Sequence, residues 1–237
     1  MRRGLQLTIV AVAIVAVISI SGFLYLTREI AAPSKDVQSS VTQLETSSTS
    51  SEEMVFRISS EESQVEYIIN EVLNGSDFMV VGVTNQVAGD ILINLSDPSQ
   101  TEIGEIAINA RTFETDEDRR DNSVARFILK SEEDANEFIT FMPTSIGTLP
   151  ASIAVGDTLE LEITGDLTIA GTTNSVSFSG TFTLESADQL VGSAETTVNY
   201  ADFNLSIPDV PFVASVEDSV ILRIAFVANA VTSESAA

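Results

Sequence analysis

The 237-residue sequence contains no cysteine and no histidine. Without cysteine there are no disulfide bonds, no thiolate nucleophiles and no attachment of a lipid through a cysteine. Without histidine the chain lacks the commonest general base, and the two absences together remove the imidazole and thiolate ligands of transition metals. Several large classes of enzyme and metalloprotein are therefore excluded. The lack of cysteine does not locate the protein, because many exported proteins have no disulfide.

Basic residues are also scarce. The chain has 11 lysines and arginines against 35 aspartates and glutamates, for a net charge of −24, and its only lysines are Lys35 and Lys130. Such a charge repels nucleic acid and anionic lipid headgroups, so we expect no nucleic-acid partner. We interpret the acidic surface as an adaptation to the medium rather than as a site for a cationic partner.

The N-terminus carries one long apolar run. Leu5–Leu26 contains no charged residue, and a helix of that length rises about 33 Å, enough to cross a bilayer core of about 30 Å. Arg2 and Arg3 precede it. The positive-inside rule therefore predicts that residues 1–30 form a single-pass anchor in the cell membrane, with the N-terminus in the cytoplasm and the rest outside. The alternative is a cleaved signal peptide, for which Ile30–Ala32 resembles a cleavage site.

The remaining chain divides by composition. Residues 31–53 are rich in serine and threonine and show no apolar period, so we expect a flexible linker. Residues 233–237 are predicted to form a disordered tail. Residues 54–232 are long enough for one domain with a sizeable core.

Alternating apolar residues predict that this domain is all-β and antiparallel. The clearest stretch is Gly165–Leu184, where apolar residues recur at every second position on both sides of a polar break at Ala170–Asn174. This pattern is typical of a β-hairpin with one buried face. Similar alternation occurs at residues 54–73, 91–95, 106–110, 159–163 and 222–226. Many short strands with frequent turns favour a sandwich or a closed barrel.

Residues 116–137 interrupt the β pattern. Val124, Phe127 and Ile128 fall at helical spacing, which predicts a short helical crossover that closes one end of the sheet.

The same region holds the densest cluster of acids, Glu114, Asp116, Glu117, Asp118 and Asp121. A calcium loop would need a central glycine and a closing glutamate, but Arg119 and Arg120 stand in the middle instead. We therefore expect internal ion pairs and no metal site or other cofactor. The chain also lacks G-x-S-x-G and the glycine-rich phosphate loops, so we do not expect an enzyme.

Four stretches in order resemble the YceI-like family of lipocalin-type barrels that bind polyisoprenoid lipids. The hairpin contains G-x-L-T-I-x-G-x-T-x-x-V-x-F. Thr115–Asp121 resembles the family's T-x-x-x-R-D piece, and Phe138–Phe141 its Y-P-x-I-x-F piece, with Glu137-Phe138 in place of Tyr-Pro. Asn199–Val220 has a D-F, a proline-bearing segment and V-x-D-x-V. The resemblance covers about residues 56–230 and favours a lipocalin-like β-barrel.

The resemblance implies that the barrel encloses the tail of an isoprenoid or a similar apolar lipid. The inward residues that we expect to line such a tunnel are Leu167, Ile169, Phe178, Phe182, Ile106, Ile108, Phe141, Phe203 and Phe226. Alternation alone explains each of them equally well as ordinary core, because it shows that one face is buried and not that a tunnel exists.

The sequence thus predicts a membrane-anchored, extracytoplasmic barrel that holds or carries a polyisoprenoid or a similar lipid. The alternative is a structural or stress-response surface module with a filled barrel and no ligand. An enzyme acting on lipid is disfavoured by the missing bases.

Overall fold

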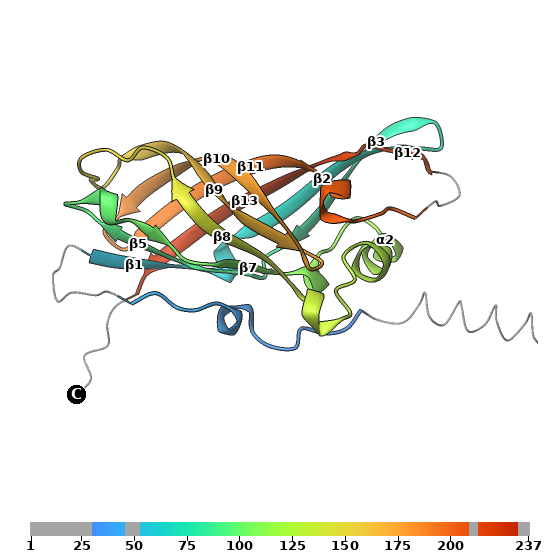
Figure 1. The fold of residues 1–237 in the computed structure, drawn as a ribbon, viewed down its shortest axis with the longest axis horizontal. Helices are drawn as coiled ribbons and strands as arrows, with labels where there is room; N and C mark the ends of the chain where they lie inside the picture. The colour runs from blue at the N-terminus through green and yellow to red at the C-terminus, as the bar shows by residue number, and fades with distance from the viewer. Residues whose placement is uncertain (1–29, 46–52, 209–212, 232–237) are drawn as a thin grey trace, which may run out of the picture.

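The computed structural model describes residues 30–45, 53–208 and 213–231, in which one antiparallel 13-stranded sheet dominates (Figure 1). The all-β antiparallel prediction is confirmed. The strands are β1 Glu53–Ile58, β2 Gln64–Leu73, β3 Ser76–Thr84, β4 Val87–Ala88, β5 Asp90–Asn94, β6 Glu102–Ile103, β7 Ile106–Asn109, β8 Phe138–Ile146, β9 Thr158–Ile169, β10 Thr172–Ser186, β11 Gln189–Asn199, β12 Val213–Val216 and β13 Ser219–Ala230.

The sheet curls into a half-barrel around β13. This strand pairs with β11 along one edge and with β1 and β2 along the other. The segment between β3 and β5 links β1 to β7, because the Ile58 amide donates to the Gly89 carbonyl at 3.0 Å and β4 pairs with β7. Two ends of the sheet are therefore brought together, with the main apolar cluster on the inner face.

The β9–β10 hairpin forms where the alternation predicts it. Its register runs from Thr172 opposite Ile169 to Thr183 opposite Thr158. The turn is only Ala170-Gly171, and both residues have positive φ angles, 46° and 77°. Two-residue turns of this kind match the twist of the flanking strands. The predicted turn was too long, since residues 172–174 already belong to β10.

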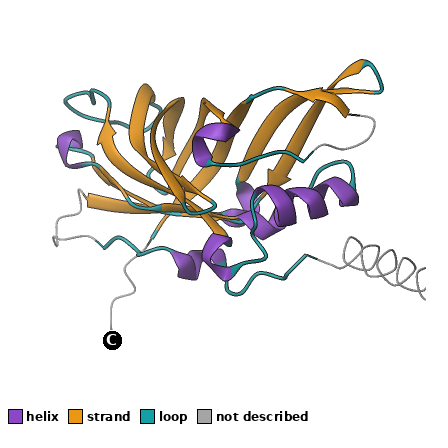
Figure 2. Cartoon of the chain, turned by 45° about the vertical axis from the view of Figure 1, so that its right-hand side comes forward, coloured by secondary structure: helices purple, strands orange, loops and turns teal. Residues whose placement is uncertain are grey.

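A helical crossover closes one end of the sheet, as predicted (Figure 2). It consists of α2, Asp118–Ser123, which continues into a single π-helical stretch at Val124–Ile128. A 3₁₀ turn at Asp134–Asn136 then leads into β8. Ala125 and Leu129 are buried and fix the crossover against the sheet.

The predicted anchor lies outside the described residues, as do residues 46–52 and the predicted tail at 233–237. Within residues 30–45, 53–208 and 213–231, no helix is both long and apolar enough to span a bilayer.

Residues 30–45 pack against the domain, so a flexible linker is not what residues 31–45, the described part of the predicted linker, form. They form a strap that packs along the outside of the sheet. Val37 and Val41 are buried against Ala88, Ala107 and the half-buried Phe138. The stretch has little apolar surface, so the sequence pattern did not reveal that polar groups far along the chain would hold it.

Those polar groups centre on a buried ion pair between Arg111 and Glu137, at 2.9 Å. The Ser34 amide donates to Glu137 at 2.7 Å, and Arg111 donates to the Ala32 carbonyl at 3.1 Å. Further along, the Leu44 amide donates to Asp90, whose side chain is fully buried beside Arg57. Burial alone would raise the pKa of Glu137, but hydrogen bonds from Ser34 and Asn109 and the charge of Arg111 outweigh it, so the pKa lies below its usual value.

Glu137→Gln is expected to lower the free energy of unfolding by about 3 to 5 kcal/mol at neutral pH, because it removes the buried counter-charge of Arg111 and leaves only the exposed Asp134. The folded-state pKa of Glu137 lies below its ordinary value of 4.5. The stabilisation is therefore complete above about pH 4.5 and is lost as the pH falls through the lower, folded-state value. Chemical denaturation of wild type and variant at several pH values should show their difference narrowing in acid.

Glu133→Gln provides the control, because Glu133 is exposed in the same loop. It should change stability by less than about 0.5 kcal/mol at every pH. A wild-type advantage over Glu137→Gln that stays constant down to pH 3 would contradict the assigned role of the pair.

Candidate functional site

The inner face of the curled sheet surrounds a cavity of about 1170 Å³. All nine residues that the sequence analysis placed in a tunnel line this cavity. They are Leu167 and Ile169 on β9, Phe178 and Phe182 on β10, Ile106 and Ile108 on β7, Phe141 on β8, Phe203 after β11 and Phe226 on β13. Their contact with a ligand stays a prediction.

The strands place these residues inward by simple alternation. Phe178 lies opposite Ile163 of β9, and both line the cavity, whereas its neighbours Ser177 and Ser179 are exposed. The Phe178 ring meets the Phe141 ring edge-on, with centroids 5.0 Å apart. This contact orients both rings across the cavity wall.

A glycine makes room for a second aromatic pair. Gly192 on β11 lies opposite Phe182 on one side and opposite Phe226 on the other. A Cβ atom at this position would come within 2.7 Å of Phe226 and 2.9 Å of Phe182. Since Gly192 has no side chain, the two rings lie over it with centroids 6.1 Å apart.

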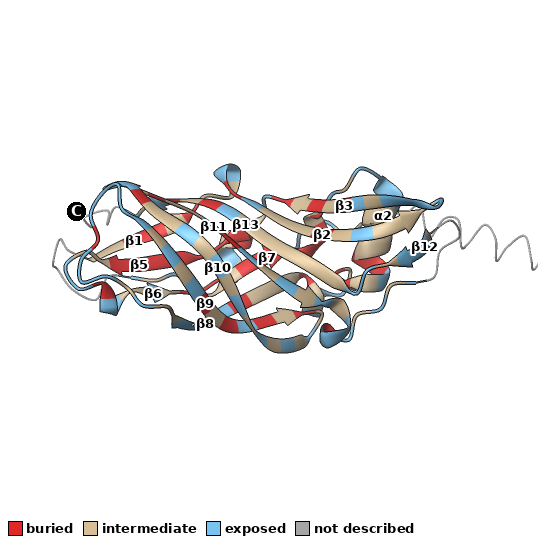
Figure 3. Cartoon of the chain, turned by 90° about the horizontal axis from the view of Figure 1, so that it is seen from above, coloured by how far each residue is buried: buried red, intermediate tan, exposed pale blue. Residues whose placement is uncertain are grey.

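The packing is unequal along the sheet (Figure 3). Strand β5 is mostly buried and β1 is half buried, whereas β2 is mostly intermediate in exposure. The half-buried inner residues of β2 include Val65, Tyr67 and Ile69, all of which line the cavity. The cavity therefore extends toward β2 and the crossover, away from the densely packed end.

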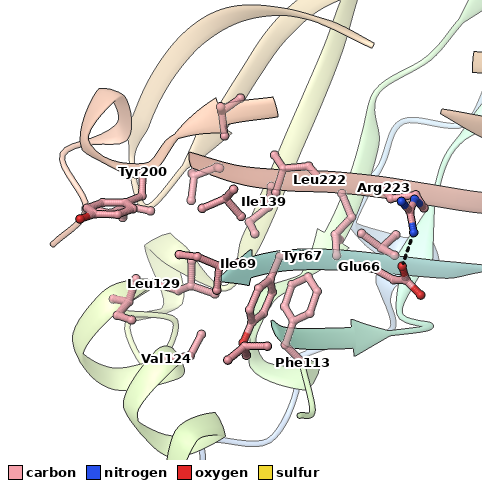
Figure 4. A pocket seen from close by; sticks show the side chains of 18 of the residues that line it. Glu66, Tyr67, Ile69, Phe113, Val124, Leu129, Ile139, Tyr200, Leu222 and Arg223 are labelled. Carbon is pink, nitrogen blue, oxygen red and sulfur yellow. Dashed lines mark hydrogen bonds and ion pairs between the residues drawn. The ribbon is translucent and has the colours of Figure 1, made fainter. Parts of the chain in front are cut away.

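Sequence reasoning missed the wall at this end (Figure 4). The missed residues with a large apolar surface include Tyr67, Ile69, Phe113, Val124, Leu129, Ile139 and Leu222. Tyr67 and Phe113 meet edge-on at 5.3 Å. The alternation of Val65, Tyr67 and Ile69 could have identified the β2 residues. Nothing in the spacing of the crossover residues shows that they turn toward the cavity.

Tyr67 is an unusual wall residue. Its ring lies across Gly82 of β3, where a Cβ atom would overlap it. Its hydroxyl is buried and has no hydrogen-bond partner among the described residues, and the same holds for Asn122 Oδ1 on α2. Burial raises the pKa of Tyr67, with the charge of Asp121 adding to the effect and that of Arg120 opposing it. The phenol is therefore neutral at physiological pH.

The cavity opens beside the crossover. Its exposed lining residues are Asn74, Glu117, Arg119, Phe127 and Pro208. They come from the β2–β3 turn, the crossover and the segment after Phe203. We call these five residues the rim. The cavity therefore communicates with solvent at the crossover end of the sheet.

Arginines form a large share of the charged cavity lining. Four of the seven basic residues after position 53 line the cavity, namely Arg119, Arg120, Arg126 and Arg223. Arg223 lies 3.3 Å from Glu66 (Figure 4), and Arg126 lies 3.0 Å from Glu132. Arg120 pairs with Asp116 and, at 3.4 Å, with Glu71. Within the acidic cluster, Asp116 is thus neutralised by an internal ion pair with Arg120.

The site is suited to burying an apolar ligand rather than to catalysing a reaction. In the described parts of the chain, no group of three or more aspartates and glutamates is arranged to hold a metal ion. The cavity wall is mainly aliphatic and aromatic, and four of its charged residues, Glu117, Arg119, Arg120 and Arg126, belong to the crossover at the opening. An arrangement of this kind can enclose a long apolar molecule and leave a polar end near solvent.

Comparison with known proteins identifies relatives that have the same fold. A family model described as the YceI-like domain matches residues 56–228. No curated protein matches the sequence. The solved structures that share the fold include the following two. A polyisoprenoid binding domain from Saccharophagus degradans, implicated in plant cell wall breakdown, is 12% identical with a TM-score of 0.57, and the match covers 74% of this chain and 98% of that one. Burkholderia cenocepacia BcnA is 17% identical with a TM-score of 0.55, over 72% and 98% of the two chains.

Tyr67→Phe is expected to raise the free energy of unfolding by about 1 kcal/mol, because it removes a buried hydroxyl without a partner. Tyr200→Phe is the control, since the Tyr200 hydroxyl donates to Asp218 on the surface at 3.2 Å and its loss should bring no gain. Thermal and chemical denaturation measure both. A Tyr67→Phe variant less stable than wild type would show that the hydroxyl does have a stabilising partner.

Proposed function

This chain belongs to the YceI-like family, and from that membership we propose that it binds a polyisoprenoid or a similar apolar lipid in its cavity. The resemblance noted in the sequence is thereby confirmed. The observation that carries the proposal is the cavity of about 1170 Å³ with its apolar wall. It exceeds the range of about 300 to 1,000 Å³ that is usual for small-molecule sites, as a long chain requires.

Burial of the lipid supplies the affinity. Each isoprene unit adds five carbons, and burying apolar carbon is worth roughly 0.8 kcal/mol per methylene-sized group before ordering costs. Several units therefore give tight binding without hydrogen bonds. This mechanism suits a cavity whose wall is formed by side chains such as Leu167, Phe178 and Phe226.

The size of the cavity favours a lipid-binding role over the alternative of a filled barrel without a ligand. A solid core packs to crystal-like density, with few voids larger than a water molecule. The half-buried state of Phe178 and Phe182 instead leaves their inner faces beside open space. The proposal is of a binding protein and not of an enzyme.

We further propose that the chain is a single-pass protein of the cell membrane, with its N-terminus in the cytoplasm and the domain outside. The support is the sequence of residues 1–30, with Arg2 and Arg3 before an uncharged run. Cell fractionation and mass spectrometry test this. Recovery of the protein as a soluble species that begins near Ala32 would establish a cleaved signal peptide instead.

Phe178→Arg is expected to lower the amount of apolar lipid that purifies with the full chain by at least about tenfold. A buried charge in the path of the lipid costs several kcal/mol, and about 1.4 kcal/mol corresponds to a factor of ten. Denaturing mass spectrometry of the released lipid, normalised to protein, gives the measurement. Ser177→Arg is the matched control, because Ser177 is the exposed neighbour on the same strand.

Melting temperatures must accompany this comparison, because Phe178→Arg would also lose lipid if it failed to fold. In that event Ala194→Phe replaces it. Ala194 lines the cavity, so the added ring occupies ligand space, and the exposed Ser193→Phe is its control. A folded variant with its full lipid load, or a wild-type protein with no more lipid than either cavity variant, would contradict the proposal.

A further inference from the structure

The rim lies at one identifiable end of the molecule. Its residues belong to the β2–β3 turn, the crossover and the segment after Phe203, and Figure 1 places these three elements together at the end that carries α2. The loop that joins β8 to β9 lies at the opposite end. Phe127 of the rim is 38% exposed, which is high for so large an apolar side chain. The opening of the cavity therefore has a defined direction.

The described chain begins at the same end. Figures 1 and 2 show the strap, residues 30–45, starting beneath the crossover and running along the outside of the sheet toward β1. Its first residues are fixed there, because the Ala32 carbonyl accepts from Arg111 and the Ser34 amide donates to Glu137. Glu137 itself follows directly after the last turn of the crossover.

Little chain separates this fixed point from the predicted membrane span. The uncharged run ends at Leu26, and Ile30 is the first described residue. The first fixed residue is Ala32, six steps after Leu26, and an extended chain covers at most about 3.6 Å per residue, so the link reaches about 22 Å. Such a link is too short for the crossover end of the domain to move far from a bilayer.

We propose that the rim faces the surface of the lipid bilayer, and that the strap holds it there so that lipid passes directly between the bilayer and the cavity. The inference rests on the proposed lipid-binding function and on the predicted span. The partner is the bilayer itself rather than a second protein. The strap thus sets both the distance of the cavity opening from the bilayer and the direction in which the opening faces.

Electrostatic attraction to lipid headgroups does not explain why the rim would lie at the bilayer. Glu117, Asp116 and Asp118 are exposed near the opening and repel anionic headgroups. The covalent anchor and the docked strap therefore supply the proximity. The rim can then meet the headgroup region with Phe127 and with Arg119, whose long side chain reaches polar groups while its stem lies along apolar surface.

The absence of tryptophan allows a direct test. Phe127→Trp places a single reporter on the rim, and Val155→Trp places one in the β8–β9 loop at the opposite end, where Val155 is 56% exposed. Each full-length variant is reconstituted in phosphatidylcholine vesicles whose acyl chains carry bromine, which quenches tryptophan on contact. We expect several-fold stronger quenching at position 127 than at 155. Equal quenching, or stronger quenching at 155, would overturn the proposed orientation.

Two insertions test the strap. Twenty Gly and Ser residues between Glu29 and Ile30 lengthen the link to the membrane and leave every strap contact intact. Quenching at position 127 should then fall toward that at 155. The same insertion between Thr49 and Ser50 lies after the strap, so the docked contacts still hold the domain and quenching should persist. If the first insertion has no effect, or the second abolishes quenching, the strap does not orient the domain.

These measurements do not depend on a ligand in the cavity. A protein that shows the expected quenching but never carries isoprenoid would disprove the proposed lipid and leave the orientation standing. A protein that carries lipid but shows no preferential quenching at position 127 would retain the lipid-binding function and lose the further inference.

Discussion

The arrangement of the outer face depends on the buried pair of Arg111 and Glu137. Arg111 reaches the Ser131 carbonyl at 2.7 Å, the Ala32 carbonyl at 3.1 Å and the Glu132 carbonyl at 3.2 Å, besides its bonds to Glu137 and Asp134. One guanidinium thus joins the end of β7, the loop after the crossover and the start of the strap. Removing the Arg111 charge would leave Glu137 buried and unpaired, and removing the Glu137 charge would leave Arg111 with only the exposed Asp134 as its partner. Either loss costs far more than a surface pair contributes. The pair therefore holds three segments in one geometry.

On the inner face of the sheet, glycines that lie opposite aromatic residues on neighbouring strands make room for the rings of the cavity wall. Gly192 accommodates Phe182 and Phe226, and Gly82 accommodates Tyr67. A side chain at either glycine would overlap the ring beside it, so each ring occupies space next to the sheet that a larger residue would take. The same alternation of inward residues can therefore accommodate large rings in the wall where the facing residue is glycine.

The strands and the family could be predicted from the sequence because both are recorded in local patterns. Period-two alternation identified β9 and β10 and placed Leu167, Ile169, Phe178 and Phe182 on the cavity side. The crossover was also predicted, but its contribution to the wall was not, since helical spacing does not tell which neighbour a face will meet. The strap was misinterpreted for a related reason. It has two buried valines and a side-chain hydrogen bond from Gln38 to the Ile58 carbonyl, and other contacts use backbone groups whose partners lie as far as 103 residues away along the chain.

The position of the opening matters because of where the energy barrier for a lipid lies. The interior of a bilayer is as apolar as the cavity wall, so moving an isoprenoid from one to the other changes its burial little. Passage through water is different, since a chain of roughly twenty-five carbons would expose apolar surface worth about 20 kcal/mol at 0.8 kcal/mol per carbon. Under the proposal that the rim meets the bilayer, the lipid never crosses that barrier. A site without strong polar contacts can then exchange its ligand readily, because neither state holds the chain much more tightly than the other. Under this proposal the strap contributes to lipid exchange as much as the residues of the cavity wall do.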